Sequence, residues 1–385
     1  NDPNRLSTNN KFVNDINKDA ALEISMSGYT IGDKTIYKKL HSLKAGELAI
    51  FKENSYEIHQ YFKYFYNAKD SHFDYLEALS KLTIKIFKKM LDSIGGRQIV
   101  IPLSAGNDSR LVASILKELG STNVICYSYG LSGNFEVKTA KLIAEKLGYK
   151  WFFVPLSHKS EKIFYESDEY KNYLKFSETC SSVPFIQSLS TIKYLKESNF
   201  IDDDAVFING NSGDFISGLH LNYLFKSDDE VTDLKIRKEA ILNSIVKKHF
   251  SLWGQLTTTM NINKIKKSLW NEIEPQCGAL TDDNDHAFYE YSEFIDRQSK
   301  YVVTGQRAYE FYGHEWRLPL WDNEYIDFWV KVPAKFKKNQ SLYSDMLKKN
   351  NFANVWGEEV PVNNKTITPK WIIPLRFICK IPFGL

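Results

Sequence analysis

The 385-residue sequence has little cysteine and no cysteine pair. Its four cysteines are far apart, and no Cys-x-x-Cys occurs: Cys126, Cys180, Cys277 and Cys379. This spacing excludes a zinc scaffold and a disulfide framework, and it favours a reducing, cytoplasmic environment. No apolar run approaches the roughly 20 residues that span a bilayer, so we expect no transmembrane segment. The sequence starts with Asn1-Asp2-Pro3-Asn4 rather than Met, and from these residues we expect no signal peptide.

The sequence also lacks a strong excess of charge. Lys and Arg number 50 against 47 Asp and Glu, which gives a formal net charge of +3. We therefore expect no nucleic-acid partner, and a polyanionic ligand would need a local site rather than a basic face. Hydrophobic residues make up 43% and charged residues 25% of the chain, so it can bury a core and is not disordered.

Two regions differ in their sequence pattern, and we place the boundary between residues 1–70 and 71–385. The first region contains short apolar and β-branched pieces, which predict strands at residues 21–26, 28–30, 47–51 and 56–62. From Asp74 the apolar residues recur at helical spacing, and this helix should be capped by Asp74 and end at Gly95. The first region is too short for a strong core and should pack on the second.

Strands and helices alternate after this helix. The predicted strands are residues 98–103, 123–129, 151–155 and 205–209. The predicted helices are residues 111–119 and 134–147, and a helical stretch is predicted for about residues 161–198. Such alternation indicates an α/β fold with a parallel sheet and right-handed crossovers. The remainder of the chain is predicted to be mostly helical.

The loop Ser104-Ala-Gly-Asn-Asp-Ser-Arg110 follows the first buried strand of this sheet. Open α/β sheets bind ligands at the carboxyl ends of their strands. Gly106 would let the backbone approach an anion, and the Ser104 and Ser109 hydroxyls could donate to it. Asp108 suits a phosphate only if Mg²⁺ lies between them. A second interpretation, in which Asp108 or Ser109 merely caps the helix, stays open.

Two common nucleotide and hydrolase motifs are missing. The chain has no Gly-x-x-x-x-Gly-Lys-Ser/Thr and no Gly-x-Ser-x-Gly around these serines. The loop instead resembles the Ser-Gly-Gly-x-Asp-Ser loop of the ATP pyrophosphatases. These enzymes have the PP-loop fold, which is also called adenine nucleotide alpha hydrolase-like.

Later segments resemble the asparagine synthetase family in the same order. The matching segments are residues 128–148, Gly210-Asn-Ser-Gly-Asp214 through Gly218, Arg317-Leu-Pro-Leu-Trp-Asp322 and Asn363-Asn-Lys365. Residues 35–46 are similar to the last strands of the family's glutaminase domain. The resemblance thus implies a PP-loop synthetase domain with helical additions, preceded by a partial glutaminase-like β-rich region.

This resemblance implies an ATP-dependent ligase that adenylates a carboxylate, releases pyrophosphate and passes the acyl group to ammonia or another amine. ATP and Mg²⁺ would be the cofactors. The implied nucleotide-binding residues are Leu103, Ser104, Gly106, Asp108, Ser109, Arg110, Tyr129 and Gly210. Asp108 and Asp214 would share the metal, and Lys365 would stabilise the adenylate phosphate or the developing oxyanion. The predicted catalytic residues are therefore Asp108, Asp214, Lys365 and Asn211.

Four positions depart from the family pattern. Ala105 replaces a glycine of the loop, Asn211 and Phe215 replace acidic residues, and Arg110 follows the loop. Asn211 cannot act as a base for the incoming amine, so another group must do so, the nucleophile differs, or catalysis is weak. Arg110 could bind phosphate or a substrate carboxylate, or lie on the helix surface.

The amine source and the substrate stay open at this point. No cysteine precedes Cys126, so glutamine hydrolysis is not expected within this sequence; a separate glutaminase or biosynthetic partner, or free ammonia, would supply the amine. The changed Asn211 and Phe215 favour a specialised carboxylate such as a sugar acid or a peptide side chain. The alternatives are a catalytically impaired nucleotide-binding or scaffold protein and an RNA-modifying ATP pyrophosphatase. The histidines are predicted to be structural.

Overall fold

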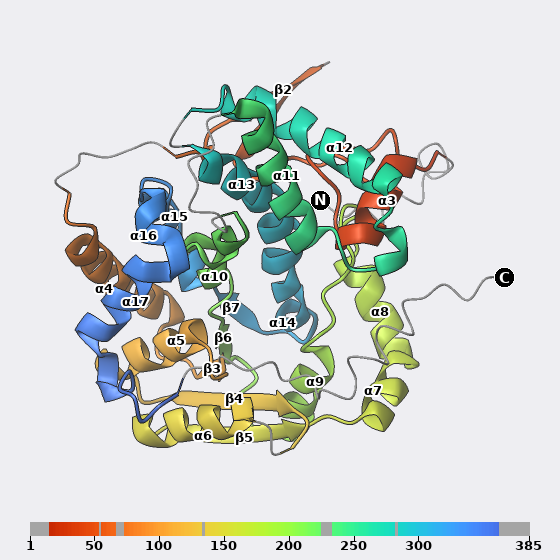
Figure 1. Ribbon diagram of the computed structural model, residues 1–385. Coiled ribbons are helices and arrows are strands. Elements are labelled where there is room, and N and C mark those ends of the chain that lie inside the picture. Colours follow the sequence, from red (N-terminus) through yellow and green to blue (C-terminus); the bar gives the residue numbers. More distant parts are fainter. Residues whose placement is uncertain are drawn as a thin grey trace.

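A central sheet of five parallel strands organises the molecule (Figure 1). The computed structural model describes residues 15–53, 55–66, 73–132, 135–224, 233–281 and 284–361. The strands occur in the order β5-β4-β3-β6-β7. Their bounds are Ile99–Pro102 (β3), Val124–Gly130 (β4), Lys150–Pro155 (β5), Val206–Ile208 (β6) and Glu315–Arg317 (β7). The four predicted strands of the sheet are confirmed, and only the three-residue β7 was not predicted.

Each face of the sheet packs against its own hydrophobic cluster. In β3, Ile99 and Ile101 belong to one cluster and Val100 to the other, as the alternation of side chains along a strand requires. The first cluster includes residues of α4 (Tyr75–Ile94), α5 (Asn107–Glu118) and α6 (Phe135–Leu147). The second includes residues of α8 (Asp168–Ser177), α9 (Leu189–Glu197) and α14 (Arg307–Phe311). Helices therefore cover both faces, as the predicted α/β class requires.

The helix boundaries agree with the sequence signals to different degrees. The Asp74 carboxylate accepts a hydrogen bond from the Glu77 N–H at the start of α4, and Gly95 ends this helix with φ 65°. The helix α5 begins four residues before the predicted start at Leu111. The helical stretch predicted for residues 161–198 consists of three helices: α7 (His158–Tyr165), α8 and α9. Asn134, the predicted start of the next helix, lies outside the described residues.

The prediction of a strand at residues 21–26 is wrong, because this segment lies in helix α3 (Lys18–Ser27). The Asn17 side chain accepts hydrogen bonds from the N–H groups of Asp19 and Ala20 and so caps the helix. Ala20, Glu23 and Met26 are buried at intervals of three, the spacing of one helix face. A short apolar run can form either a strand or a helix, and here the capping residue Asn17 favours the helix.

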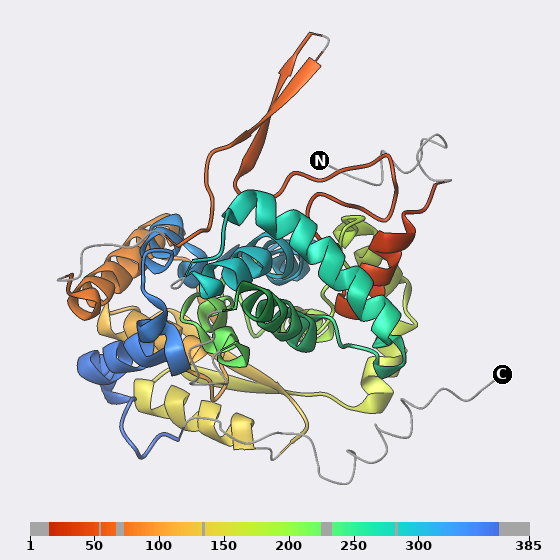
Figure 2. The ribbon, with the colours of Figure 1, turned by 45° about the horizontal axis from the view of Figure 1, so that its top comes forward.

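The predicted strands near residues 47 and 56 are confirmed as an antiparallel hairpin, β1 (Glu47–Lys52) and β2 (Ser55–Gln60). This hairpin projects away from the rest of the molecule (Figure 2). The remainder of the front region packs on the sheet domain, since Met26, Tyr29 and Tyr64 share a hydrophobic cluster with α4 and α5. The division into domains at residue 70 stays a prediction.

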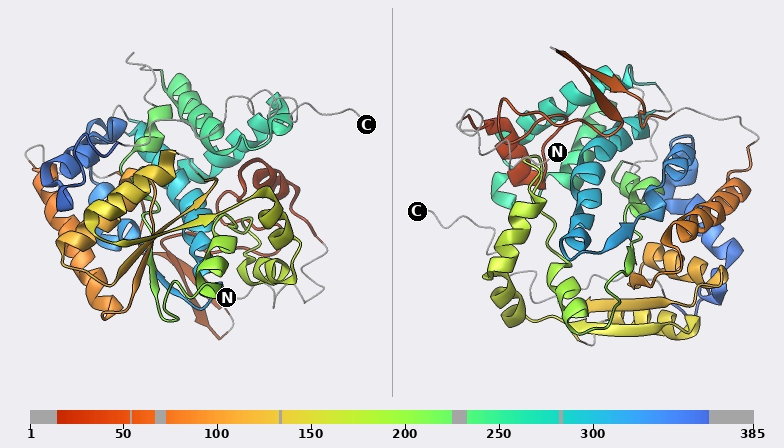
Figure 3. Two further views of the ribbon diagram at one scale, coloured as in Figure 1. Left: turned by 90° about the horizontal axis from the view of Figure 1, so that it is seen from below. Right: turned by 180° about the vertical axis from the view of Figure 1, so that it is seen from behind.

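Helices make up most of the remaining chain. The helices α11, α12 and α13 lie on the side of the molecule opposite β4 and β5 (Figure 3). None of the described helices is long and apolar enough to cross a membrane. The elements not yet named are α10 (Gly213–Ile216), η1 (Leu219–Tyr223), α11 (Leu234–His249), η2 (Gly254–Leu256), α12 (Thr259–Cys277), α13 (Asp285–Glu293), the π-helix η3 (Phe294–Val303), η4 (Thr304–Gln306), η5 (Pro319–Trp321), α15 (Asn323–Trp329), α16 (Ala334–Lys337), η6 (Lys338–Gln340), α17 (Ser341–Asn350) and η7 (Phe352–Asn354).

Candidate active site at the strand ends

A cleft of about 1140 Å³ opens at the carboxyl ends of β3, β4 and β6. It is lined by nine of the residues that the sequence singled out: Leu103, Ser104, Gly106, Asp108, Ser109, Tyr129, Gly210, Asn211 and Asp214. The ends of three neighbouring strands, in the sheet order β4-β3-β6, therefore contribute to one cleft, where parallel sheets bind their ligands. Lys365 lies outside the described residues.

The loop after β3 leaves the start of α5 without a side-chain cap. Gly106 is the N-cap residue, and no side chain accepts a hydrogen bond from the first turn. The interpretation of Asp108 or Ser109 as a cap is therefore wrong. Instead, the Ser109 hydroxyl lies 3.0 Å from the Ser104 hydroxyl and accepts a hydrogen bond from the Ser104 N–H, also at 3.0 Å. The first-turn N–H groups and the positive end of the helix dipole suit an anion.

Asp108 and Asp214 lie close together beside this loop. Burial, and then the charge of Asp214, raise the pKa of Asp108 well above its usual value. The Tyr343 hydroxyl donates a hydrogen bond to Asp108 Oδ1 at 2.9 Å. This hydrogen bond and one from the Asp214 backbone lower the pKa of Asp108, but by less than burial and Asp214 raise it. Two carboxylates in one partly enclosed place repel each other unless a cation or a proton lies with them.

This pair has the donor chemistry that Mg²⁺ requires. Magnesium prefers carboxylate oxygens together with water and phosphate oxygens, rather than a complete cage of protein ligands. A divalent cation between Asp108 and Asp214 would offset both the burial of Asp108 and the repulsion by Asp214 that raise the pKa of Asp108. The two aspartates therefore fit a magnesium ion shared with a bound phosphate.

Two glycines hold the second loop against Asp108. A Cβ atom on Gly213 would lie 2.3–2.4 Å from the carboxyl group of Asp108, and one on Gly210 would lie 2.7 Å from its carbonyl carbon. No side chain larger than hydrogen fits at either position without movement of Asp108. Gly210 and Gly213 thus have a physical role: they bring Asp214 next to Asp108.

Arg110 does not join the other predicted nucleotide-binding residues. Its side chain is only 1% exposed, so the prediction of a helix-surface arginine is wrong. The guanidinium donates hydrogen bonds at 2.9 Å to the carbonyls of Val360 and Pro361, with a longer one of 3.4 Å to Ala105. It is absent from the cleft lining among the described residues. The structure thus places Arg110 as a link between α5 and the segment after η7.

Other parts of the resembling segments have structural roles. The Arg317 guanidinium donates to the Ser93 hydroxyl at 3.1 Å, and the Asp322 carboxylate caps α15 by accepting from the Glu324 N–H at 2.9 Å. Phe215, which stands where the family has an acidic residue, packs against Tyr64 and Trp321 at centroid distances of 5.3 and 6.2 Å. Its aromatic ring thus belongs to the core as well as to the wall of the cleft.

The π-helix η3 supplies cleft residues that the sequence did not indicate. Arg297, Gln298 and Tyr301 line the cleft from this element, and His220 joins them from η1. A π-helical turn alters the spacing of side chains and frequently occurs at functional sites. Residues 285–303 mix polar and apolar side chains as an ordinary amphipathic helix does, so nothing in the sequence marked these residues as part of a site. Gln298 contacts Ser212, which lies 86 residues away in the chain.

Two comparisons with known proteins found similar sequences. The family model described as "Asparagine synthase" matches residues 94–350. A protein of Acanthamoeba polyphaga mimivirus, named "Probable asparagine synthetase [glutamine-hydrolyzing]", is 28% identical over 183 residues. The match covers 43% of this chain and 31% of the viral protein, so the chain spans about a third of the length of this relative.

Proposed function

Because the chain belongs to the asparagine synthase family, whose model matches residues 94–350, we propose that it is an ATP-dependent ligase that forms amides. It adenylates a carboxylate with release of pyrophosphate and passes the acyl group to ammonia or another amine. The observation that carries this proposal is the meeting of the Ser104–Ser109 loop, which includes Asp108, with Asp214 in one cleft.

The loop and the two aspartates would act in the first half-reaction. The substrate carboxylate attacks the α-phosphorus of ATP, and pyrophosphate leaves with concentrated negative charge. The first-turn N–H groups of α5 and the hydroxyls of Ser104 and Ser109 would stabilise that charge. When bound by Asp108 and Asp214, Mg²⁺ neutralises charge on the phosphates. Leu103, Tyr129 and Gly210 would line the adenosine pocket.

The second half-reaction needs a group that takes a proton from the amine. Asn211 lies in the cleft, where the family pattern has a carboxylate, and its amide is not basic. It could still orient the amine or the acyl group by hydrogen bonds. Lys365 would stabilise the adenylate phosphate or the oxyanion that forms at the acyl carbon.

The aromatic side chains of the cleft favour a specialised carboxylate. Besides the phosphate loop, the lining includes Tyr165, Phe185 and Tyr301. Aspartate offers little apolar surface to such residues, whereas a sugar acid or a peptide would contact them. We therefore favour one of these substrates. The nucleophile would be ammonia, taken from solution or from a separate glutaminase partner, or it would be another amine.

The test is release of pyrophosphate from Mg²⁺-ATP by the full chain across a panel of carboxylates: aspartate, sugar acids and acidic peptides. At least one carboxylate should stimulate release, and Asp108→Ala should lower it about 100-fold, the usual cost of losing a preorganised electrostatic group. Asp92→Asn is the matched control, because Asp92 is exposed on α4, and it should retain wild-type activity.

The outcomes separate the proposal from its alternatives. Product analysis should find AMP and an amide in equal amounts. ATP binding without pyrophosphate release for any carboxylate would favour a scaffold protein. Release that depends on added RNA would favour an RNA-modifying ATP pyrophosphatase.

A further inference from the structure

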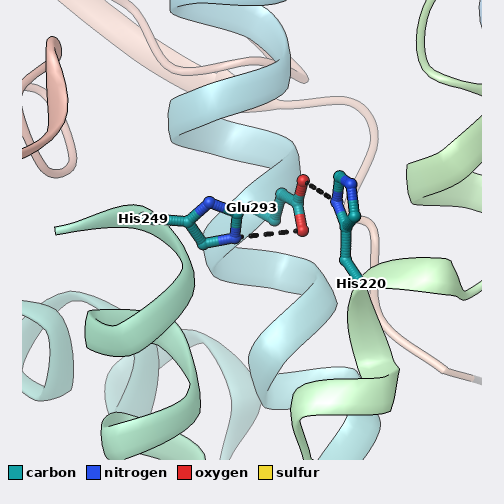
Figure 4. Close-up of side chains that lie close together, drawn as sticks. All are labelled: His220, His249 and Glu293. Carbon is teal, nitrogen blue, oxygen red and sulfur yellow. Dashed lines mark hydrogen bonds and ion pairs between the residues drawn. The ribbon is translucent and has the colours of Figure 1, made fainter. Parts of the chain in front are cut away.

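His220 lies in the wall of the proposed active site, beside the loop that carries Asn211. It comes from η1, which follows directly after α10 and Gly218. Asn211, Asp214 and His220 all line the same cleft. The neighbours of His220 are shown in Figure 4, where its ring faces the carboxylate of Glu293.

The hydrogen bond to Glu293 fixes the tautomer of His220. Nδ1 of His220 lies 2.6 Å from Glu293 Oε1, and both side chains are buried. An ionised carboxylate can only accept, so Nδ1 carries a proton, and in the neutral imidazole the lone pair lies on Nε2. Nε2 lies on the side of the ring away from Glu293 (Figure 4), and it has no hydrogen-bond partner within the described part of the chain.

A second set of hydrogen bonds ties Glu293 to the Asn211 loop. The Ser212 hydroxyl donates to Gln298 Oε1 at 2.9 Å, and Gln298 Nε2 donates to Glu293 Oε1 at 2.8 Å. The neighbour of Asn211 is therefore linked through one buried glutamine to the carboxylate that orients His220. This network fixes the imidazole relative to the loop that lacks its acidic residue.

We propose that His220 is the general base of the amide-forming step and that Glu293 is its positioning residue. This inference rests on the proposed function. As the amine nitrogen bonds to the acyl carbon, Nε2 of His220 accepts a proton from that nitrogen. The bond between the acyl carbon and the adenylate oxygen breaks, and AMP leaves with the electron pair. The imidazolium lies against the Glu293 carboxylate, which stabilises it, and the proton then passes to solvent.

The contacts of this cluster favour a proton acceptor over a metal site. Ligand atoms of His220, His249 and Glu293 lie within 4.8 Å of one another, close enough for a cation. However, Glu293 Oε1 already accepts from His220 and Gln298, and the Arg297 guanidinium lies 3.4 Å from it. His249 Nε2 lies 3.1 Å from the Tyr289 hydroxyl. A cation would have to replace these hydrogen bonds next to a positive charge.

The test measures the two half-reactions separately in the full chain. Adenylation is followed as exchange of labelled pyrophosphate into ATP with the carboxylate that supports pyrophosphate release. Amide formation is followed with ammonium chloride. His220→Gln should lower amide formation about 100-fold and change exchange little, because a general base contributes about 10²–10⁴-fold to the step it serves. Added imidazole should restore part of the rate of His220→Ala.

His249→Gln is the matched control. His249 also contacts Glu293, at 3.3 Å, but it does not line the cleft among the described residues. This variant should keep both half-reactions, whereas Glu293→Gln should slow amide formation without rescue by imidazole. Hydroxylamine, which is a neutral nucleophile near pH 7, should react with the adenylate of His220→Gln better than ammonia does. A structural role of His220 would instead lower both half-reactions together.

Chemical labelling tests the geometry without any substrate. Diethylpyrocarbonate acylates an accessible unprotonated imidazole nitrogen, so peptide mapping should find His220 modified and His249 protected. Labelling of His249 alone, or a transition metal bound to these side chains in the purified protein, would overturn the proposal. Unchanged amide formation in His220→Gln would also overturn it and leave the proposed function intact. Failure of every carboxylate to release pyrophosphate contradicts the proposed function instead.

Discussion

The position of Asp108 depends on a glycine that has no chemical role of its own. Gly213 opens α10, and a methyl group in place of its hydrogen would collide with the Asp108 carboxyl group. Its φ lies outside the left-handed region that favours glycine. An alanine would therefore suit the backbone, and the effect of the substitution is steric.

Gly213→Ala should lower pyrophosphate release about 100-fold, because displacement of a catalytic group by about 1 Å has this effect. It should lower the free energy of unfolding by only about 1–3 kcal/mol, the usual cost of overpacking. The measurements are the release assay and urea unfolding. Gly95→Ala is the control: Gly95 has φ 65° and no atom within 4 Å of its added Cβ, so stability should fall while activity stays. Equal activity in both variants would contradict the steric role of Gly213.

At the scale of the elements, the sequence predicted the four strands β3–β6 because each is a short apolar run bounded by turns or a helix. It missed β7, whose three residues include two charged side chains. The loop residues from Ser104 to Ser109 could be predicted because they follow a buried strand, and Asp214 because its segment resembles a family motif. The cleft residues of η3 could not, since only tertiary packing brings Arg297 and Gln298 beside His220.

Arg110 is a residue whose role the sequence suggested incorrectly. Its position after the loop suggested a phosphate ligand, but its guanidinium lies under the segment that follows η7. It also lies 5.2 Å from the centre of the Trp356 ring, a cation–π contact. One buried side chain thus connects the first turn of α5 to the last described residues of the chain.

Arg110→Lys should detach this connection, because an ammonium group cannot donate to several carbonyls in the geometry of a guanidinium. The free energy of unfolding should fall by about 3 kcal/mol, since buried carbonyls lose their donors. Hydrogen exchange of residues 352–361 should accelerate more than that of β3. The control is Arg97→Lys, whose partner Glu315 is exposed, and it should cost about 0–1 kcal/mol. Unchanged exchange in residues 352–361 would contradict the role of Arg110.

At the scale of the whole molecule, segments distant in sequence meet in a buried polar cluster. His249 ends α11, Glu293 ends α13, and His220 belongs to η1. Burial, only partly opposed by Glu293, lowers the pKa of His249 to about 4. Burial by itself would raise the pKa of Glu293. The interactions of this carboxylate with His220 and His249 together have the larger effect and hold its pKa well below the usual value. The folded protein therefore holds a neutral His249 beside an ionised Glu293.

The free energy of unfolding should consequently fall as the pH decreases from 6.5 towards 4. In this range the unfolded chain binds a proton at His249 that the folded protein excludes, so acid favours the unfolded state. Protonation of Glu293 in the unfolded chain acts in the same direction at lower pH. The loss attributable to His249 should reach about 3 kcal/mol. Urea unfolding of wild type and His249→Gln at several pH values measures it: the variant should be less stable at neutral pH and show a flatter dependence on pH. Parallel pH profiles would mean that His249 does not stay neutral in the folded protein.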